Sequence, residues 1–317
     1  MSAEVNPLQG RILDTIKGSV ATATLFLAFM MLPLFGLVPG LFTPAPCVFY
    51  SLKNGRKTGI AVVLVTCSLV AALAGPATVA IYLLQAGVMS LALPEFLVRL
   101  KGGARSIVYS VAVNLVMMVA AAAIYGYVTG ANLHTKVTKG VQASIAQTTQ
   151  LYEKAGVKGD ELKAMQDSMR MAGEQIVVIY PALITVALGI LGCINLYLLA
   201  RVAGRAGLPI YLGNFRQYRN PEPLVWLLIA SGFAMLLDND IAHMVSLNLL
   251  IVVCALYLVQ GFAVISHFFR KFAVPTFIKV MGCLFLIFQP FMLLVVAALG
   301  VFDLWGDFRS PKTQQNL

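Results

Sequence analysis

The chain has 317 residues, of which 59% are hydrophobic and only 11% are charged. An ordinary soluble domain carries about 25% charged residues, so the composition excludes that class. A net charge of +10 suggests nucleic-acid binding in a soluble protein, but Lys and Arg here cluster between long apolar runs, as the positive-inside rule describes. We therefore predict a multi-pass membrane protein that contacts the lipid bilayer and binds no nucleic acid.

The apolar runs are long enough to cross a membrane as helices. A hydrocarbon core about 30 Å thick needs roughly 20 helical residues, and backbone groups in lipid must find partners within the protein. The runs lack the alternating pattern of membrane β-strands. The predicted fold is therefore all-α, a bundle of eight or nine transmembrane helices with a helical insert outside the membrane.

Residues 1–128 predict an N-terminal membrane bundle of about five spans. The first two candidates are short, and Pro44 and Pro46 predict that the second is broken or partly re-entrant. The candidate spans cover residues 19–35, 37–52, 58–74, 77–98 and 106–128.

Residues 129–173 are too polar for the membrane. Val137, Val141 and Ile145 repeat at helical spacing, and Asp160 is a suitable cap for a second helix. The segment therefore predicts an extracytoplasmic helical hairpin, or one helix that leads into the next span. Its apolar stripe packs against the protein itself or serves as a surface for a membrane protein partner.

Residues 174–317 predict a C-terminal membrane bundle of about four spans with a short polar tail. Pro181 falls early in the first of these spans, and Pro290 predicts a kink in the last one. The candidate spans cover residues 176–199, 224–237, 245–268 and 277–301.

The positions of the basic residues predict an orientation. Placing the N-terminus and four basic segments in the cytoplasm collects 15 of the 23 Lys and Arg residues on that side. The expected location is the bacterial cytoplasmic (inner) membrane, with the N-terminus in the cytoplasm. Nine spans put the C-terminal tail outside, whereas eight spans and one re-entrant segment put it inside.

Sequence motifs that indicate catalysis are missing. The chain contains no HExxH, GxSxG or P-loop sequence. Its five cysteines form no CxxC pair, so neither a zinc site nor a disulfide framework is expected. We predict that the protein is not an enzyme and needs no metal or cofactor.

Polar side chains within the apolar segments are the candidates for function, because they are costly to bury in lipid. Glu95 precedes Arg99 by four residues, which favours a helical ion pair. The carboxylate is either neutralised there or serves as a gate or ligand contact. Other polar candidates either join helices by hydrogen bonds or face a ligand; these are Asn114, which follows Ser106 and Ser110 at four-residue spacing, Asn195, Gln260 and His267.

The C-terminal run Gly300-Val-Phe-Asp303-Leu-Trp305-Gly-Asp307-Phe-Arg309 resembles the signature ending of the YybS-like family of bacterial membrane proteins. Pro181, Asn195 and Asn248 agree with that resemblance. The family has no established activity, so the resemblance implies a fold without a mechanism. More distantly, the N-terminal half is similar to the substrate-binding subunits of energy-coupling-factor vitamin transporters and to the rod-shape protein MreD.

Two functions are compatible with the sequence. The first is a membrane-embedded component that binds or transports a small solute, with Glu95, Asn114 and Gln260 near the site. The second is a non-catalytic scaffold for cell-envelope proteins, which uses residues 129–173 as its docking surface.

Overall fold

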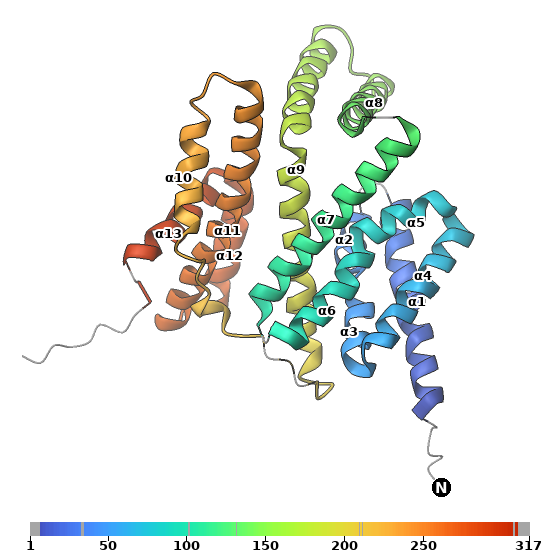
Figure 1. Ribbon diagram of the computed structural model, residues 1–317. Coiled ribbons are helices and arrows are strands. Elements are labelled where there is room, and N and C mark those ends of the chain that lie inside the picture. The colour runs from blue at the N-terminus through green and yellow to red at the C-terminus, as the bar shows by residue number, and fades with distance from the viewer. Residues whose placement is uncertain are drawn as a thin grey trace, which may run out of the picture. The chain divides into compact units, whose positions relative to one another are not determined.

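The computed structural model describes residues 7–32, 35–100, 102–130, 132–208, 210, 212–306 and 308–309. Every regular element in these ranges is a helix, which confirms the predicted all-α class (Figure 1). The chain divides into two compact units. Unit 1 comprises Met1–Asn132 and Ala187–Gly213, and unit 2 comprises Leu133–Val186 and Asn214–Leu317.

Unit 1 is built from eight elements in the N-terminal part of the chain and from the end of one long helix. The eight elements are α1 (Pro7–Met31), α2 (Leu37–Phe42), α3 (Ala45–Asn54), α4 (Arg56–Ala74), α5 (Pro76–Tyr82), the π-helix η1 (Leu83–Gly87), α6 (Val88–Leu100) and α7 (Gly103–Thr129). The long helix, α9 (Asp160–Ala203), belongs to unit 1 from Ala187 onward.

Unit 2 contains the hairpin and the C-terminal helices. Its elements are α8 (Leu133–Lys154), the first part of α9, the 3-10 helix η2 (Phe215–Gln217), α10 (Leu224–Ala234), α11 (Asp240–Lys271), α12 (Thr276–Phe288) and α13 (Phe291–Gly306).

The number of membrane spans is lower than predicted. Six described helices are long and apolar enough to cross a membrane, or seven if the bent pair of α12 and α13 forms one span. The expected span over 37–52 is divided into α2 and α3, of six and ten residues, because prolines interrupt the backbone hydrogen bonds there. The expected span over 224–237 holds only the 11-residue helix α10.

Proline and glycine stand at several of the breaks between helices. Pro290 falls between α12 and α13, whose axes differ by 112°, so the predicted kink is a complete interruption. Gly55 and Gly75 bound α4 at φ values of 94° and 89°, where other residues are strained. These positions show that short-range sequence rules fixed the helix ends.

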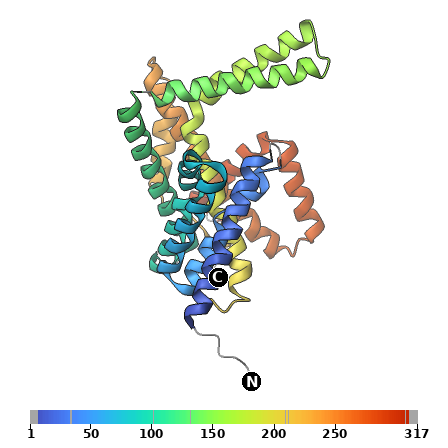
Figure 2. The same ribbon diagram turned by 90° about the vertical axis from the view of Figure 1, so that its right-hand side faces the viewer.

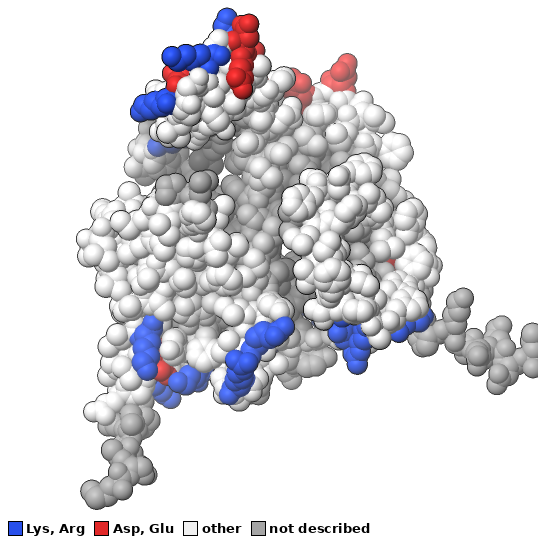
Figure 3. Space-filling view, turned by 180° about the vertical axis from the view of Figure 1, so that it is seen from behind, with Lys and Arg blue, Asp and Glu red and all other residues white. Residues whose placement is uncertain are grey.

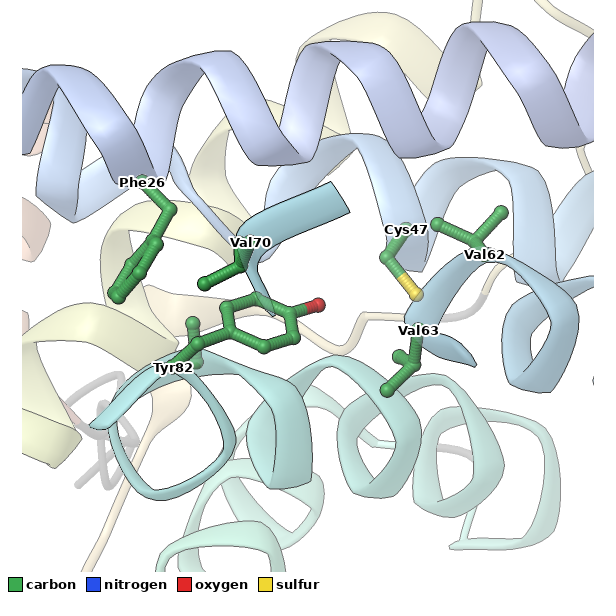
Figure 4. Close-up of a cluster of buried hydrophobic side chains, with 7 residues drawn as sticks. Phe26, Cys47, Val62, Val63, Val70 and Tyr82 are labelled. Carbon is green, nitrogen blue, oxygen red and sulfur yellow. The ribbon is translucent and has the colours of Figure 1, made fainter. Parts of the chain in front are cut away.

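The core of unit 1 forms where α1, α3, α4 and α5 meet. The ring of Tyr82 packs edge-on against Phe26 at 5.3 Å between centroids, and both side chains are fully buried. Figure 4 shows the Tyr82 hydroxyl pointing into the cluster formed with Cys47, Val63 and Val70. A polar group is thus enclosed by apolar neighbours at the centre of this unit.

Residues 133–173 form two helical arms, and the second arm is the start of the long helix α9. Helix α8 ends at Lys154, the chain turns at Gly156 and Gly159, and the start of α9 runs back along α8 (Figure 2). A Cβ on Gly173 would lie 2.7 Å from Ile145, so the two arms pack closely. Helix α9 then continues without a break for 44 residues into the next apolar segment.

Within unit 2, the Asn248 side chain of α11 forms hydrogen bonds with backbone groups of α9 beside Pro181. The Ala182 N–H donates to Asn248 Oδ1 at 2.9 Å, and Asn248 Nδ2 donates to the Val178 carbonyl at 2.8 Å. In an undisturbed helix these two backbone groups would bond to each other. The amide therefore bridges the helix at its proline, as partners do for interrupted helices in membranes.

We expect the substitution Asn248→Leu to lower the free energy of unfolding of unit 2 by about 2 kcal/mol, because it takes the side-chain partner from two part-buried backbone groups. The measurement is denaturant unfolding in detergent followed by tryptophan emission. It reports on unit 2 because Trp226 and Trp305, the two tryptophans of the chain, both lie there. An unchanged unfolding midpoint would show that the bridge adds nothing.

Candidate functional site

A buried ion pair lies at the end of α13 in unit 2. Asp303 is fully buried, and the Arg309 side chain is 9% exposed. Arg309 Nε donates to Asp303 Oδ1 at 3.2 Å, and Arg309 Nη2 donates to Asp303 Oδ2. The guanidinium therefore grips the carboxylate in the two-point geometry that gives Arg pairs their strength.

The same arginine also binds the segment that precedes α10. Arg309 Nη1 donates to the Arg216 carbonyl at 2.9 Å and to the Tyr218 carbonyl at 2.8 Å. Arg219 approaches from this segment, and its Nη2 donates to the Asp303 carbonyl at 3.2 Å. One charged cluster thus fastens the end of α13 to residues 216–219.

Gln260 of α11 completes the cluster. Its Nε2 donates to Asp303 Oδ2 at 3.0 Å, and its Oε1 accepts from the Asn220 N–H at 2.9 Å. Asn220 Nδ2 donates in turn to the Leu256 carbonyl at 3.0 Å. Both the nitrogen and the oxygen of the Gln260 amide form hydrogen bonds, so this side chain joins α11 to α13 and to the segment before α10.

Close backbone packing brings α11 and α13 together one turn from this cluster. A Cβ on Gly261 would lie 1.9 Å from the Val296 carbonyl oxygen, and one on Gly300 would lie 2.1 Å from the Tyr257 carbonyl oxygen. Only glycine fits at either position. The two glycines allow the contact that sets Gln260 against Asp303.

The C-terminal motif therefore divides between the interior and the surface. Gly300, Asp303 and Arg309 hold unit 2 together, whereas Trp305 is 67% exposed. Its exposure fits an indole at a membrane surface. Asp307 lies outside the described residues. The sequence reasoning missed the role of residues 216–220, since no local spacing links them to Asp303.

Glu95 and Arg99 form the expected ion pair in unit 1. The Glu95 carboxylate is 28% exposed, and Arg56 Nη1 lies 3.9 Å from the same oxygen. Two cations therefore surround one partly exposed carboxylate at the end of α6. The structure shows this neutralisation, while a role as gate or ligand contact stays a prediction.

Asn114 differs from the other candidates because its amide is buried without partners. It is fully buried on α7, on the same face as the buried Ser106 and Ser110. The two serines donate to the carbonyls four residues earlier. Within the part of the chain that the structure describes, neither Nδ2 nor Oδ1 of Asn114 forms a hydrogen bond.

Further buried polar atoms without partners lie on elements that pack in the same unit. Among the described residues of unit 1 they include Thr22 Oγ1 on α1, Tyr82 Oη on α5 and Gln85 Oε1 in η1. Helix α7 contacts both η1 and α6. Asn114 therefore belongs to a helix that packs against the π-helix.

The π-helix itself singles out this region. A π-turn inserts one extra residue into a helix, and such turns occur often at functional sites. Buried polar groups are nearly always hydrogen-bonded, so a group of unpartnered ones needs an explanation. Tyr82 precedes η1, Gln85 lies in it and Asn114 lies on α7, which contacts it, so this part of unit 1 is the candidate binding site.

The two remaining candidates lie apart from both groups. Asn195 of α9 donates through Nδ2 to the Leu41 carbonyl at 2.9 Å and so joins α9 to α2. His267 is partly exposed near the end of α11, and its ring meets that of Phe268 edge-on. The structure thus unites Gln260, Asp303 and Arg309 in unit 2, while Asn114 and Asn195 belong to unit 1.

Comparison with known proteins shows the family to which the chain belongs. No curated protein and no solved structure matches the chain. Residues 20–304, which contain nearly all the helices as well as Asn114, Gln260 and Asp303, match the family described as "Predicted membrane protein (DUF2232)". Because this match covers most of the sequence, the chain belongs to that family of membrane proteins.

Proposed function

We propose that this protein binds a small uncharged solute inside unit 1, as a membrane-embedded binding or transport component. The observation that carries the proposal is the buried, unpartnered amide of Asn114 on α7, a helix that contacts η1. A buried polar group without a partner destabilises a protein by about 1–3 kcal/mol. A solute that offers both a donor and an acceptor to this amide recovers that free energy on binding.

The chemistry of the neighbouring groups defines the solute class. Asn114, Gln85, Tyr82 and Thr22 offer neutral donors and acceptors among apolar side chains. The described carboxylates of unit 1, Asp14 and Glu95, are both held in ion pairs. A cationic solute would therefore enter without a counter-ion, which is costly in an apolar interior.

The sequence resemblance supports the same reading. The N-terminal half, which provides most of unit 1, is the part for which the sequence predicts a distant similarity to the substrate-binding subunits of energy-coupling-factor vitamin transporters. The resemblance to YybS-like proteins is in keeping with the bacterial inner membrane as the location. We also propose that the N-terminus is cytoplasmic and that the hairpin of α8 and α9 lies on the opposite side of the membrane.

The test of this orientation is alkaline phosphatase inserted after Gly156. The enzyme would be active only if the hairpin lies outside the cytoplasm.

The test uses thermal unfolding of the full chain in detergent. Replacement of the cysteines other than Cys47 by alanine leaves one thiol, which is fully buried in the unit 1 core. Its reaction with a fluorogenic maleimide then reports the unfolding of unit 1. Free nucleobases, nicotinamide and primary amides serve as uncharged probes, and citrate and lysine serve as charged ones.

We expect at least one uncharged probe to raise the unfolding midpoint and the charged probes to leave it unchanged. In Asn114→Leu the midpoint without solute rises, because the unpartnered amide is gone, and the effect of the probe disappears. Asn248→Leu is the matched control in unit 2 and keeps the effect. A probe effect that survives in Asn114→Leu would exclude Asn114 from the site, and a panel without any effect would contradict the proposal.

The scaffold hypothesis rests on a separate feature. The hairpin of α8 and α9 contains a groove of about 690 Å³ lined by both arms, among them Val141, Ile145 and Val177. Figure 3 shows side chains of both charge signs on the hairpin. Replacement of Val137–Met169 by a short linker would remove crosslinks to envelope proteins if this function holds.

A further inference from the structure

A cleft with a positive lining opens at one end of unit 1. It has a volume of about 420 Å³ and lies between the first turns of α1 and the turn from α3 into α4. Its charged lining residues are Arg11, Arg56 and Lys57, and its neutral polar ones include Thr15, Asn54 and Thr58. No acidic residue belongs to the described lining. The cleft is therefore suited to an anion.

Within the described part of the chain, Arg56 is the one cation of this lining that lies within 4 Å of a carboxylate. Asp14 is held by Lys53 at 2.7 Å and by the Asn54 amide at 2.8 Å. Glu95 pairs with Arg99 and lies 3.9 Å from Arg56. Among the described residues, the side chains of Arg11 and Lys57 form no ion pair with a carboxylate. Two exposed cations at the cleft are thus available to a ligand.

The backbone at the cleft adds donors for an anion. Helix α4 starts at Arg56, and no side chain caps its first turn. The Thr58 and Gly59 N–H groups donate to the Gly55 carbonyl, so the N–H groups of Arg56 and Lys57 are the ones at this helix start that can attract negative charge. The turn residue Gly55 has φ 94° and open space where a Cβ would stand. A phosphate oxygen can therefore approach the start of α4 between the two cations.

The position of the cleft indicates the source of the anion. It lies where two candidate spans begin, Leu8–Met31 and Arg56–Ala74. Phospholipid headgroups occupy this level of a bilayer. Leu8 and Ile12, which line the cleft, are 67% and 55% exposed. Apolar side chains beside a cationic lining match a lipid, with its phosphate next to an acyl chain, better than a free phosphate.

We propose that this cleft binds the phosphate headgroup of an anionic phospholipid. Arg11 and Lys57 contact the phosphate, the first turn of α4 donates backbone hydrogen bonds to it, and Leu8 and Ile12 contact the glycerol and the upper acyl chain. Basic recesses between transmembrane helices bind acidic headgroups by the same combination of contacts. This site is separate from the solute site around η1 and does not depend on it.

The test is a lipid titration of the full chain in neutral detergent, followed by native mass spectrometry. Phosphatidylglycerol, phosphatidylcholine and inorganic phosphate are the probes. We expect tighter binding of phosphatidylglycerol than of phosphatidylcholine, and no competition from excess inorganic phosphate. Each basic residue near a charged membrane surface contributes about 1 kcal/mol, so Arg11→Gln with Lys57→Gln should weaken phosphatidylglycerol binding about 30-fold.

A matched control separates this cleft from general charge attraction. Arg270→Gln with Lys271→Gln removes the same two charges from the end of α11, where both residues are exposed. This variant should keep the affinity of the wild type, and the single reversal Lys57→Glu, which changes the charge of the cleft by the same two units as the first double variant, should weaken binding about 30-fold. Equal losses in the two double variants would overturn the proposal, as would equal binding of the two lipids. Displacement by inorganic phosphate would also overturn it, because the source would then be a soluble anion.

Discussion

Substitution of Arg309 by Gln is expected to lower the free energy of unfolding of unit 2 by about 3–5 kcal/mol. The fully buried Asp303 carboxylate would lose its two-point partner, and the Arg216 and Tyr218 carbonyls would lose a donor. Gln260 Nε2 would remain, with Arg219 at 3.9 Å. A buried charge with incomplete compensation is among the most destabilising changes in a protein.

Denaturant unfolding followed by tryptophan emission measures this loss. Arg170→Gln is the matched control, because Arg170 pairs with Glu174 at 3.2 Å in an exposed position of the same unit. Its expected cost is about 0–1 kcal/mol. The double variant Asp303→Leu with Arg309→Leu should regain part of the loss, since it leaves no unpaired charge. Equal effects of Arg309→Gln and Arg170→Gln would show that burial adds nothing to the pair.

Gly261→Ala is expected to cost at least about 3 kcal/mol, because its new methyl group would overlap the Val296 carbonyl and force α11 away from α13. The displacement would also pull Gln260 from Asp303. Denaturant unfolding followed by tryptophan emission measures the loss in the free energy of unfolding.

Gly232→Ala in α10 is the control for this substitution. A Cβ at Gly232 meets open space, so the variant should gain up to about 1 kcal/mol from helix propensity. The two substitutions are chemically identical and are expected to have opposite signs. A gain in Gly261→Ala would mean that the two helices are separated by more than the structure shows.

Local rules predicted much of the fold. Pro290 and the prolines at 44 and 46 act on their immediate neighbours, so these breaks could be placed from the sequence. The ion pair of Glu95 and Arg99 needs only one helical turn and was equally accessible. The span count failed because apolar composition does not fix helix length. Residues 224–237 are apolar, yet α10 ends at Ala234.

The sequence identified single members of the Asp303 cluster in unit 2 and of the unpartnered polar groups in unit 1, but not their neighbours. Asn114 and Gln260 were recognised as unusual, but the sequence assigned them to one site, whereas their surroundings differ completely. Gln260 is fully hydrogen-bonded to Asn220 and Asp303, residues 40 and 43 positions away. Contacts over such separations depend on how the helices pack, and a single sequence carries no local signal for them.

The amide bridge beside Pro181 bears on how the protein is made. A chain emerges from its N-terminus, so α9 leaves the ribosome before α11. Until Asn248 follows, the Ala182 N–H and the Val178 carbonyl lack the groups that bind them in the finished fold. Lipid offers no substitute for Asn248, so until then the two groups have only each other as partners within α9. The arrival of α11 should therefore change the hydrogen bonding of this turn, and the final shape of α9 at Pro181 is set only once the two helices lie side by side in the membrane.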